Sequence, residues 1–396
     1  MIKIVIIGGS FGGLTSAFEL KRLLGKKAEI TLLCDQDRFV FIPSLPWVAM
    51  GRRRPEDITL SLEKILRPKG INFIHEGAIG VDVASSKVIT KSQEILYDYL
   101  VIATGPYCDF SQVPGLGPEG GYTECIFALE QALRLKEAWH RVLENPGPMV
   151  IGSVQGVSCF GPIYEYAFEV DAELRRRKIR HKVPITFVTS EPYIGHFGMG
   201  GLGNSKWIME NEFAKREIKI ITNIAVDEFI PDEVRLSDGT KLPFRLAMFA
   251  APMTGVKAVF HLGNSKGFIP VDSNYRHKNY KNIFAAGVAI AMAPAEQTCI
   301  PIGMPKTGFM TVKMAKDAAN AIASDILGKP LLEPSPLDVV CLLDLGKTAA
   351  MMKAKPIYPP RQESTIKQGI YYKWLKAGFE KYFLWKTKHG MITYIK

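Results

Sequence analysis

The chain lacks three features that would place it in familiar protein classes. Its 396 residues include six cysteines, with no Cys-x-x-Cys pair and no cysteine–histidine spacing of a zinc site, so no metal is expected. No apolar run reaches about 18 residues, the length that a membrane-spanning helix needs. No basic or apolar leader precedes the first expected strand, Ile2–Ile7, which favours the cytoplasm as the place where the chain folds and works.

The net charge of +11 is concentrated towards the C-terminus, where eight basic residues accompany two glutamates from Arg361 onward. In the same stretch Tyr371, Trp374, Leu375 and Tyr382 recur at helical spacing. A basic, aromatic, amphipathic helix is typical of a segment that lies on a lipid bilayer surface. The alternative is a helix packed on its own protein or on a second copy in a homo-oligomer. Nucleic acid is not an expected partner, because no helix-turn-helix or RNP-like strand accompanies the charge.

The N-terminus carries a dinucleotide-binding turn. The apolar strand Ile2–Ile7 runs into Gly8-Gly9-Ser10-Phe11-Gly12-Gly13, and Thr15–Leu24 reads as the helix that follows. In the Gly-x-Gly-x-x-Gly pattern only the middle glycine is replaced, by Ser10, which is small enough for phosphate oxygens to approach. The next strand, Glu29–Cys34, ends at Asp35, where a carboxylate can accept a hydrogen bond from a ribose hydroxyl.

A second turn of this kind has lost its glycines. The apolar residues 149–151 enter Gly152, but Val154 and Val157 occupy the positions where a pyrophosphate requires glycine, and Cys159 follows. A thiol therefore stands near the place that a pyridine nucleotide would take. The expected reductant is not NADH.

Three further turns fit a flavoprotein with two dinucleotide-binding domains. The strand 97–103 runs into Thr104-Gly105, the strand 282–286 leads to Gly287, and a helix over 309–327 opens after Lys306-Thr307-Gly308. The start of that helix and Lys306 would face an electron-rich group such as a reduced flavin ring.

We therefore expect an α/β fold with two Rossmann-like dinucleotide-binding domains and a C-terminal membrane-associating helical segment. Residues 1–115 and 265–330 would form the FAD-binding domain. Residues 116–264 would form an inserted second domain with a degenerate NADH site that carries Cys159. Residues 331–396 would contain Cys341 and amphipathic membrane-binding helices.

Over nearly its whole length the chain resembles the sulfide:quinone oxidoreductases, a family of flavoproteins with two dinucleotide-binding domains. The segments that carry the resemblance are Thr123-Glu124-Cys125, Gly156-Val157-Ser158-Cys159-Phe160-Gly161-Pro162, Ser190-Glu191-Pro192-Tyr193-Ile194-Gly195-His196-Phe197-Gly198, Pro305-Lys306-Thr307-Gly308, Val339-Val340-Cys341 and Phe379-Glu380-Lys381-Tyr382-Phe383. The cysteine and histidine segments are specific to the family, whereas the glycine turns are shared with other flavoproteins. The resemblance implies FAD as cofactor, sulfide as electron donor and a membrane quinone as acceptor.

The resemblance also implies roles for particular residues. Cys159 and Cys341 would form a redox-active disulfide or polysulfide bridge that faces the flavin, with Cys341 favoured as the thiolate that reacts with the ring. Cys125 would be a third cysteine of the site, and His196 and Glu165 would handle protons. The residues expected to bind FAD are Gly8, Gly9, Ser10, Phe11, Gly12, Asp35, Ala78, Thr104, Gly105, Gly287, Lys306 and Gly308.

The remaining cysteines and one departure from the family pattern limit this assignment. Cys34 and Cys108 are expected to be buried, inert thiols, and Cys299 has no counterpart in the family pattern. The family can carry a histidine four residues after its first cysteine, where this chain has Leu129, so the duty of Cys125 stays open.

Three other functions are consistent with parts of the sequence. A type II NADH:quinone oxidoreductase would share the flavin, the quinone and the membrane helix, but the degraded second turn and the cysteines count against it. A flavocytochrome-type sulfide dehydrogenase would normally begin with an export signal. The third alternative is not an enzyme: a flavin-bearing membrane scaffold or redox sensor.

Overall fold

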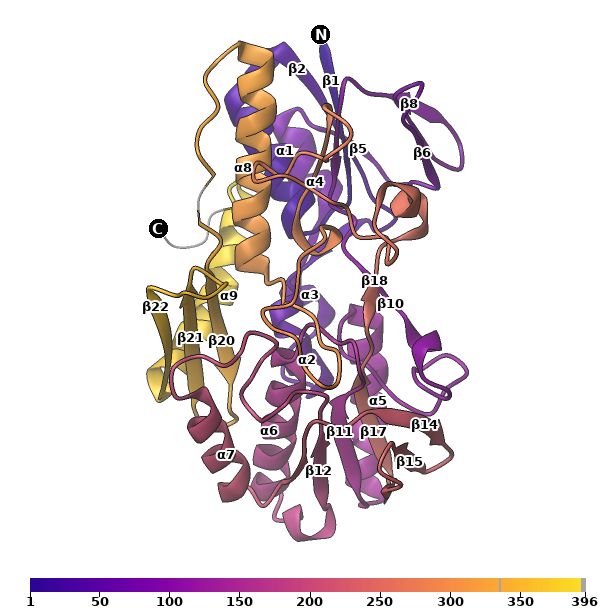
Figure 1. Cartoon of the computed structure of the whole chain (residues 1–396), viewed down its shortest axis with the longest axis vertical. Helices are drawn as coiled ribbons and strands as arrows, with labels where there is room; N and C mark the ends of the chain where they lie inside the picture. The colour runs from indigo at the N-terminus through magenta and orange to yellow at the C-terminus, as the bar shows by residue number, and fades with distance from the viewer. Residues whose placement is uncertain (335, 393–396) are drawn as a thin grey trace.

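The computed structural model describes residues 1–334 and 336–392, so Lys396, the last of the basic residues noted above, lies outside it. The upper part of Figure 1 is built on a five-stranded parallel sheet. Four of its five strands are short, mostly buried apolar runs, as in parallel sheets covered on both faces, whereas the edge strand Asn72–Ile74 is partly exposed. In spatial order they are β19 (Ile283–Ala285), β9 (Tyr99–Ile102), β1 (Ile2–Ile7), β2 (Ala28–Leu33) and β5 (Asn72–Ile74).

Two long helices, α1 (Phe11–Leu24) and α8 (Gly308–Leu327), pack against each other beside this sheet (Figure 1). Both are rich in alanine, glycine and other small residues on the sides where they meet, which lets them approach closely. Helix α8 ends at Gly328, which adopts the left-handed conformation typical of a helix C-terminus.

The lower part of Figure 1 contains a second parallel sheet, of four strands. Helix α6 (Gly161–Arg176) follows its strand β11, as a Rossmann-like unit requires, and α5 (Leu129–Glu144) and α7 (Ser205–Lys215) complete the layer. The two parallel sheets confirm the predicted α/β class. In spatial order the strands are β13 (Lys219–Ile221), β12 (Ile185–Val188), β11 (Met149–Ser153) and β17 (Leu246–Ala250).

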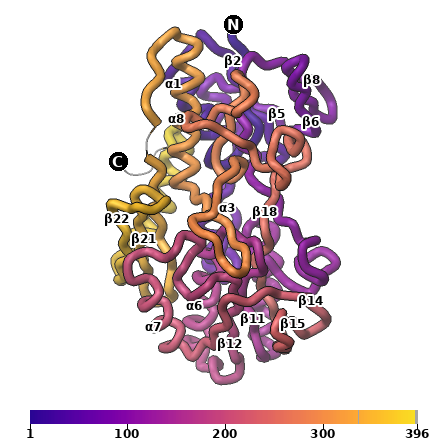
Figure 2. Tube along the Cα trace, viewed as in Figure 1, coloured from indigo at the N-terminus to yellow at the C-terminus, as the bar shows by residue number. Residues whose placement is uncertain are grey.

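The chain passes between the two parts through a two-stranded ribbon, β10 (Tyr107–Cys108) and β18 (Met253–Thr254), which is visible midway down Figures 1 and 2. Smaller elements surround the two parallel sheets. They are the antiparallel sets β3 (Arg38–Val40) with β4 (Thr59–Ser61), β6 (Gly80–Asp82) with β7 (Lys87–Ile89) and β8 (Glu94–Leu96), and β14 (Val226–Ile230) with β15 (Glu233–Leu236) and β16 (Lys241–Pro243), and the short helices α2 (Leu45–Ala49), α3 (Pro55–Ile58) and α4 (Leu62–Leu66).

The C-terminal segment begins with an antiparallel sheet of β20 (Val339–Asp344), β21 (Ala349–Lys355) and β22 (Glu363–Gly369). The sequence predicts amphipathic helices in this segment and does not indicate the sheet. Helix α9 (Ile370–Lys388) follows and lies behind this sheet in Figure 1. Within the described ranges, no helix is long and apolar enough to cross a membrane.

Helix α9 is amphipathic, with its aromatic side facing outward and charged residues on the side that faces the protein. Its exposed side carries large apolar side chains, with Trp374 70% and Trp385 54% exposed, whereas Lys376 and Glu380 are buried. A helix that buries charge and exposes tryptophan is not covered by its own protein on the aromatic side. The aromatic residues expected to reach a bilayer therefore do face outward.

Candidate active site

The first glycine turn, between β1 and α1, has the shape of a phosphate-binding loop. Gly8 has φ of +112°, and a Cβ there would lie 2.2 Å from the carbonyl oxygen of Ala103. Ser10 caps α1, but its hydroxyl makes no hydrogen bond to the first turn of the helix. The N–H groups and the positive end of the helix dipole are therefore available to an anion.

Three strands and two helices meet at this turn. Ile7 of β1 is in register with Ile102 of β9, which in turn pairs with Ala285 of β19, so the turns after these strands share one edge of the sheet. A Cβ on Gly287 would lie 2.8 Å from the side chain of Thr311 in α8, which shows how tightly the two layers close. This edge holds Gly9, Phe11, Gly12, Thr104, Gly105 and Gly308 as well.

The end of β2 carries an acceptor where a dinucleotide would place its ribose. Asp35 follows β2, and a Cβ on Gly77 would lie 3.3 Å from its Cβ, so the segment that contains Ala78 passes beside it. The glycine cradle, the uncapped start of α1 and the carboxylate at the end of β2 are the donor and acceptor set that FAD requires. The residues present therefore fit the cofactor.

Lys306, expected to face the flavin, is anchored by the backbone. Its ammonium group donates to the carbonyl oxygens of Val288 (3.1 Å) and Ile290 (2.6 Å). Burial lowers the pKa of Lys306 to about 8. The lysine thus ties the start of α8 to the loop after β19 and sets a positive charge beside the cofactor-binding edge.

The second turn, between β11 and α6, is closed by the protein itself. The N–H of Gly156 donates to the carbonyl oxygen of Pro301 (2.7 Å), and the carbonyl of Val157 accepts from the N–H of Gly303 (2.9 Å). Val154 and Val157 are fully buried. The segment 301–303 and the two buried valines therefore engage the turn where a nucleotide-binding loop would expose its N–H groups to a pyrophosphate.

Cys159 and Cys341 come together although 182 positions separate them. Cys159 stands just before α6 and Cys341 on β20, and these two elements pack against each other. Burial, together with the nearby Cys341 and Glu165, raises the pKa of the Cys159 thiol to about 12. Burial and Glu165 likewise raise the pKa of Cys341 to about 11. Both are free thiols in this structure.

Glu165 lies on the first turns of α6, buried beside both thiols. Its Oε1 forms an ion pair with Lys376 of α9 and accepts a hydrogen bond from the N–H of Asp344 (2.6 Å). Burial raises the pKa of Glu165, and Lys376 opposes that shift. The carboxyl can therefore hold or give up a proton next to the two sulfurs.

Further buried charges extend this pair into a cluster. Asp344 accepts from the indole N–H of Trp47 (3.0 Å). Glu169, one turn beyond Glu165, is completely buried, with neither oxygen hydrogen-bonded and Arg52 3.5 Å away. Burial, then the charge of Asp344, raises the pKa of Glu169 to about 8. A site with this many buried ionisable groups is typical of chemistry that moves protons.

His196 lies in a tight loop next to the second turn. A Cβ on Gly198 would lie 3.2 Å from the ring of Phe160, the neighbour of Cys159. One ring nitrogen of His196 lies 2.6 Å from a carboxylate oxygen of Glu296, and the other accepts from the N–H of Gly198 (3.1 Å). Burial lowers the pKa of His196. The structure thus places His196 beside the sulfur-bearing turn but gives it Glu296 as its partner.

The inward side of α9 also reaches the cofactor-binding turn. Phe383 packs against Phe11, with ring centroids 5.2 Å apart, and against Phe41 at 5.3 Å. Phe11 in turn contacts Phe39 at 5.2 Å. One helix therefore touches the first glycine turn through its rings and the cysteine site through Lys376.

Sequence reasoning missed the partners that complete the site. Lys376, Asp344, Glu169 and Glu296 were not among the candidates, although Glu169 follows Glu165 by four residues and so shares its helix face. That spacing was a usable signal. No local pattern could have paired Glu296 with a histidine 100 residues away.

The chain belongs to the pyridine nucleotide-disulphide oxidoreductases, whose family model matches residues 2–319. It is 41% identical to the sulfide-quinone reductase of Aquifex aeolicus over 98% of this chain and 92% of that protein. Within this class it is a member of the sulfide-quinone reductase family, and hence an FAD-dependent oxidoreductase.

Solved structures agree. The crystal structure of the sulfide:quinone oxidoreductase from the hyperthermophilic bacterium Aquifex aeolicus superimposes with a TM-score of 0.95 at 40% identity, covering 99% of this chain and 92% of that one. The structure of NDH2 from Plasmodium falciparum superimposes with a TM-score of 0.74 at 14% identity, covering 98% of this chain and 96% of that one, which shows the common fold alone.

Proposed function

We propose that this protein oxidises sulfide to polysulfide or sulfur and passes the electrons through FAD to a membrane quinone. The observation that carries the proposal is the meeting of Cys159 and Cys341 beside Glu165, at a turn whose nucleotide-binding groups the protein itself occupies. Membership of the sulfide-quinone reductase family supports the same conclusion. FAD, when bound, accepts two electrons from the sulfur site and delivers them to the quinone.

The cysteines act through disulfide exchange. Hydrosulfide attacks a disulfide or polysulfide bridge between Cys159 and Cys341; a new S–S bond forms on one cysteine and the other leaves as a thiolate. Because burial raises the pKa of both thiols to about 12 and about 11, a released thiolate that does not react with the flavin takes up a proton at neutral pH. Glu165 supplies that proton, and Lys376 then stabilises its carboxylate.

Other expected residues keep their proposed roles. The turns at Gly8, Gly9, Ser10, Phe11, Gly12, Thr104, Gly105, Gly287 and Gly308, with Asp35, Ala78 and Lys306, bind FAD. Residues 1–115 and 265–330 form the FAD-binding domain, 116–264 the sulfur-carrying domain and 331–396 the membrane segment. His196 and its partner Glu296 together handle the proton of incoming sulfide.

The protein meets the bilayer through the exposed aromatic side of α9. Tyr371, Trp374 and Trp385 are each more than half exposed, and basic residues of the same helix can meet anionic headgroups. Docking there brings a lipid-soluble quinone to a helix that contacts the cofactor turn through Phe383. We place this surface on the cytoplasmic side of the membrane.

Anaerobic titration of the flavin-loaded protein tests the proposal. Sulfide should bleach the flavin absorbance and NADH should not, and a short-chain quinone should restore the colour. Cys159→Ala and Cys341→Ala should abolish bleaching by sulfide. Cys299→Ala, which removes an exposed thiol outside the site, should leave bleaching unchanged.

Other outcomes would identify the alternatives. Bleaching by NADH and not by sulfide would make the protein an NADH:quinone oxidoreductase. A flavin that neither donor reduces would favour a membrane-bound scaffold or sensor. Full sulfide-dependent quinone reduction by either active-site variant would contradict the disulfide mechanism.

A further inference from the structure

Glu191 occupies the position from which a Rossmann-like unit binds a ribose. It follows β12, the second strand of the lower parallel sheet in chain order, just as Asp35 follows β2 in the upper one. A carboxylate at this place accepts a hydrogen bond from a ribose hydroxyl when a dinucleotide is bound. The Glu191 side chain, however, is fully buried. Its carboxylate is therefore directed at the protein and not at a ligand.

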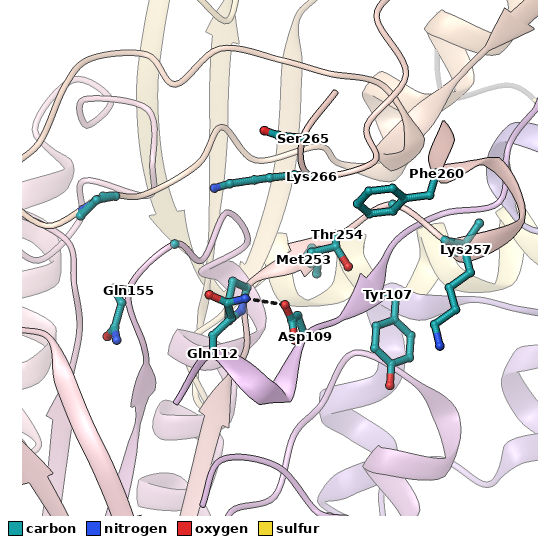
Figure 3. A pocket seen from close by; sticks show the side chains of 15 residues that line it. Tyr107, Asp109, Gln112, Gln155, Met253, Thr254, Lys257, Phe260, Ser265 and Lys266 are labelled. Atoms are coloured by element: carbon teal, nitrogen blue, oxygen red, sulfur yellow. Dashed lines mark hydrogen bonds between the residues drawn. The ribbon is translucent and has the colours of Figure 1, made fainter. Parts of the chain in front are cut away.

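The open space beside the second turn does not extend to this carboxylate. A cleft of about 770 Å³ lies there, and Gln155, Gly156 and Pro301 are among the residues that line it (Figure 3). Glu191 does not belong to this lining. Because its side chain has no exposed surface, Glu191 could not hold a nucleotide placed in the cleft. The second unit thus lacks an accessible ribose acceptor as well as its glycines.

Three donors from the protein bind the Glu191 carboxylate instead. Its Oε1 accepts a hydrogen bond from the backbone N–H of Phe197 (2.6 Å). Its Oε2 accepts from the hydroxyl groups of Tyr164 (2.8 Å) and Thr189 (2.9 Å). Burial raises the pKa of Glu191 to about 7, and the three donors oppose that shift. Hydrogen bonds to an ionised carboxylate are roughly twice as strong as neutral ones, so these donors are held firmly.

Two of the bonds fix the backbone on either side of His196. The residue after it, Phe197, donates its N–H directly to Glu191. The residue before it, Gly195, donates its N–H to the Tyr164 hydroxyl (2.9 Å), which in turn donates to Glu191. Phe197 has φ of +56°, in the left-handed region that residues other than glycine rarely adopt. Such a strained backbone persists only where its surroundings hold it.

Tyr164 connects the same carboxylate to the helix of the sulfur site. It precedes Glu165 on α6, and its buried ring packs against that of Phe197, with centroids 4.9 Å apart. Helix α6 and the His196 loop (residues 193–198) therefore share one buried carboxylate. The placement of the loop relative to the sulfur site depends on this group.

We propose that Glu191 is the positioning residue of His196. Its carboxylate holds the backbone on both sides of the imidazole, so that the ring keeps its hydrogen bond to Glu296 beside the sulfur-bearing turn. The proposal rests on the proposed function, in which His196 and Glu296 handle the proton of incoming sulfide. Glu191 itself acts only through His196.

Two variants weaken this network with little change of shape. Glu191→Gln keeps the volume of the side chain but loses its charge and one of its two acceptor oxygens. Tyr164→Phe removes only the hydroxyl that links Gly195 to the carboxylate. Glu212→Gln is the matched control, because Glu212 is a buried glutamate on α7 that pairs with Arg216 (2.6 Å).

Anaerobic stopped-flow reduction of the flavin-loaded proteins by sulfide tests the role of Glu191. Glu191→Gln and Tyr164→Phe should be reduced about tenfold more slowly than the wild type, a fraction of the roughly 10²- to 10⁴-fold contribution of a positioned base. Reoxidation of the flavin by a short-chain quinone should not change, and Glu212→Gln should behave like the wild type. In a His196→Ala background, Glu191→Gln should cause no further loss, because it acts through the missing imidazole.

The pH profile gives a readout that a general loss of structure would not produce. The ratio of the wild-type rate to that of Glu191→Gln should grow as the pH rises through about 7, because only the wild-type carboxyl ionises. Tyr164 and Tyr193 also face Glu191, but burial and neighbouring carboxylates raise their pKa values, so both stay neutral in this range. A ratio that does not change with pH, or an equal loss in the His196→Ala background, would overturn the proposal.

Amide hydrogen exchange separates this proposal from the proposed function, because it needs no substrate. Peptides that cover residues 193–198 should exchange faster in Glu191→Gln and Tyr164→Phe than in the wild type and in Glu212→Gln. Unchanged exchange would overturn the proposal. A wild-type flavin that sulfide does not bleach would contradict the proposed function, and faster exchange in the two variants would then still show that Glu191 holds the His196 loop.

Discussion

Replacing the buried Glu169 with glutamine should make the protein more stable at alkaline pH. The carboxyl is completely buried without a hydrogen bond, and burial raises its pKa from 4.5 to about 8. The folded protein therefore binds more protons here than the unfolded chain between these values, so stability falls as the pH rises through that window. Ionising the group in place costs at most roughly 5 kcal/mol, at 1.36 kcal/mol per pKa unit.

Charged groups from three other elements face Glu169. Asp344 on β20 and Glu165 on α6 itself raise its pKa, whereas Arg52 after α2 and Lys376 on α9 lower it. Glutamine keeps the volume of the side chain and cannot ionise. The free energy of unfolding of Glu169→Gln, relative to the wild type, should therefore increase steadily from about pH 5 to about pH 8 and then level off.

Urea unfolding of both flavin-loaded proteins at several pH values measures this difference. Glu173→Gln, one turn further along α6, is the matched control: Arg176 and Arg177 lower the pKa of Glu173 to about 2, so its contribution is fully present above pH 5. That variant should be destabilised by a constant amount over the same range. Parallel curves for the wild type and Glu169→Gln would refute the reasoning.

Three further predictions concern the ion pair, the membrane surface and the cofactor. Lys376→Met should lower the free energy of unfolding by about 3–5 kcal/mol, because it leaves the Glu165 carboxylate buried and unpaired. Adding Glu165→Gln should recover much of this loss, and equal losses of the single and double variants in urea unfolding would contradict the prediction. Trp374→Ala should weaken binding to anionic vesicles in flotation assays by about 10- to 100-fold, the worth of one buried ring, whereas Leu96→Ala, exposed on β8, should not. Gly8→Ala should yield protein with almost no bound flavin, measured as the flavin-to-protein absorbance ratio, since the new Cβ would lie 2.2 Å from a carbonyl oxygen.

The glycine turns could be predicted because their chemistry is local. A strand, a glycine that needs positive φ and a following helix are adjacent in sequence, and Gly8 shows all three in the structure. The loss of the second turn was visible in the same way, from Val154 and Val157. The cysteine pair could be proposed only through family resemblance, since no spacing rule joins positions 159 and 341.

The buried charges of α9 could not be predicted, because their orientation depends on distant elements. On α9 alone, Lys376 and Glu380 look like a solvated face opposite the aromatic one. In the fold they turn inward because Glu165 of α6 and Arg53 after α2 pair with them. The sheet β20–β22, which places Cys341, was likewise missed in a segment expected to be helical.

The hydrogen bonds that close the second turn have a consequence for protein engineering. Restoring glycine at Val154 and Val157 would recreate the sequence pattern of a nicotinamide site, but the N–H of Gly156 would still be bonded to Pro301, and Gly303 to the carbonyl of residue 157. The same segment continues into Lys306 and the start of α8, which belong to the proposed flavin-binding edge. Changing the electron donor would therefore require a rebuilt loop over 301–305, and that rebuilding would disturb the flavin's own binding site.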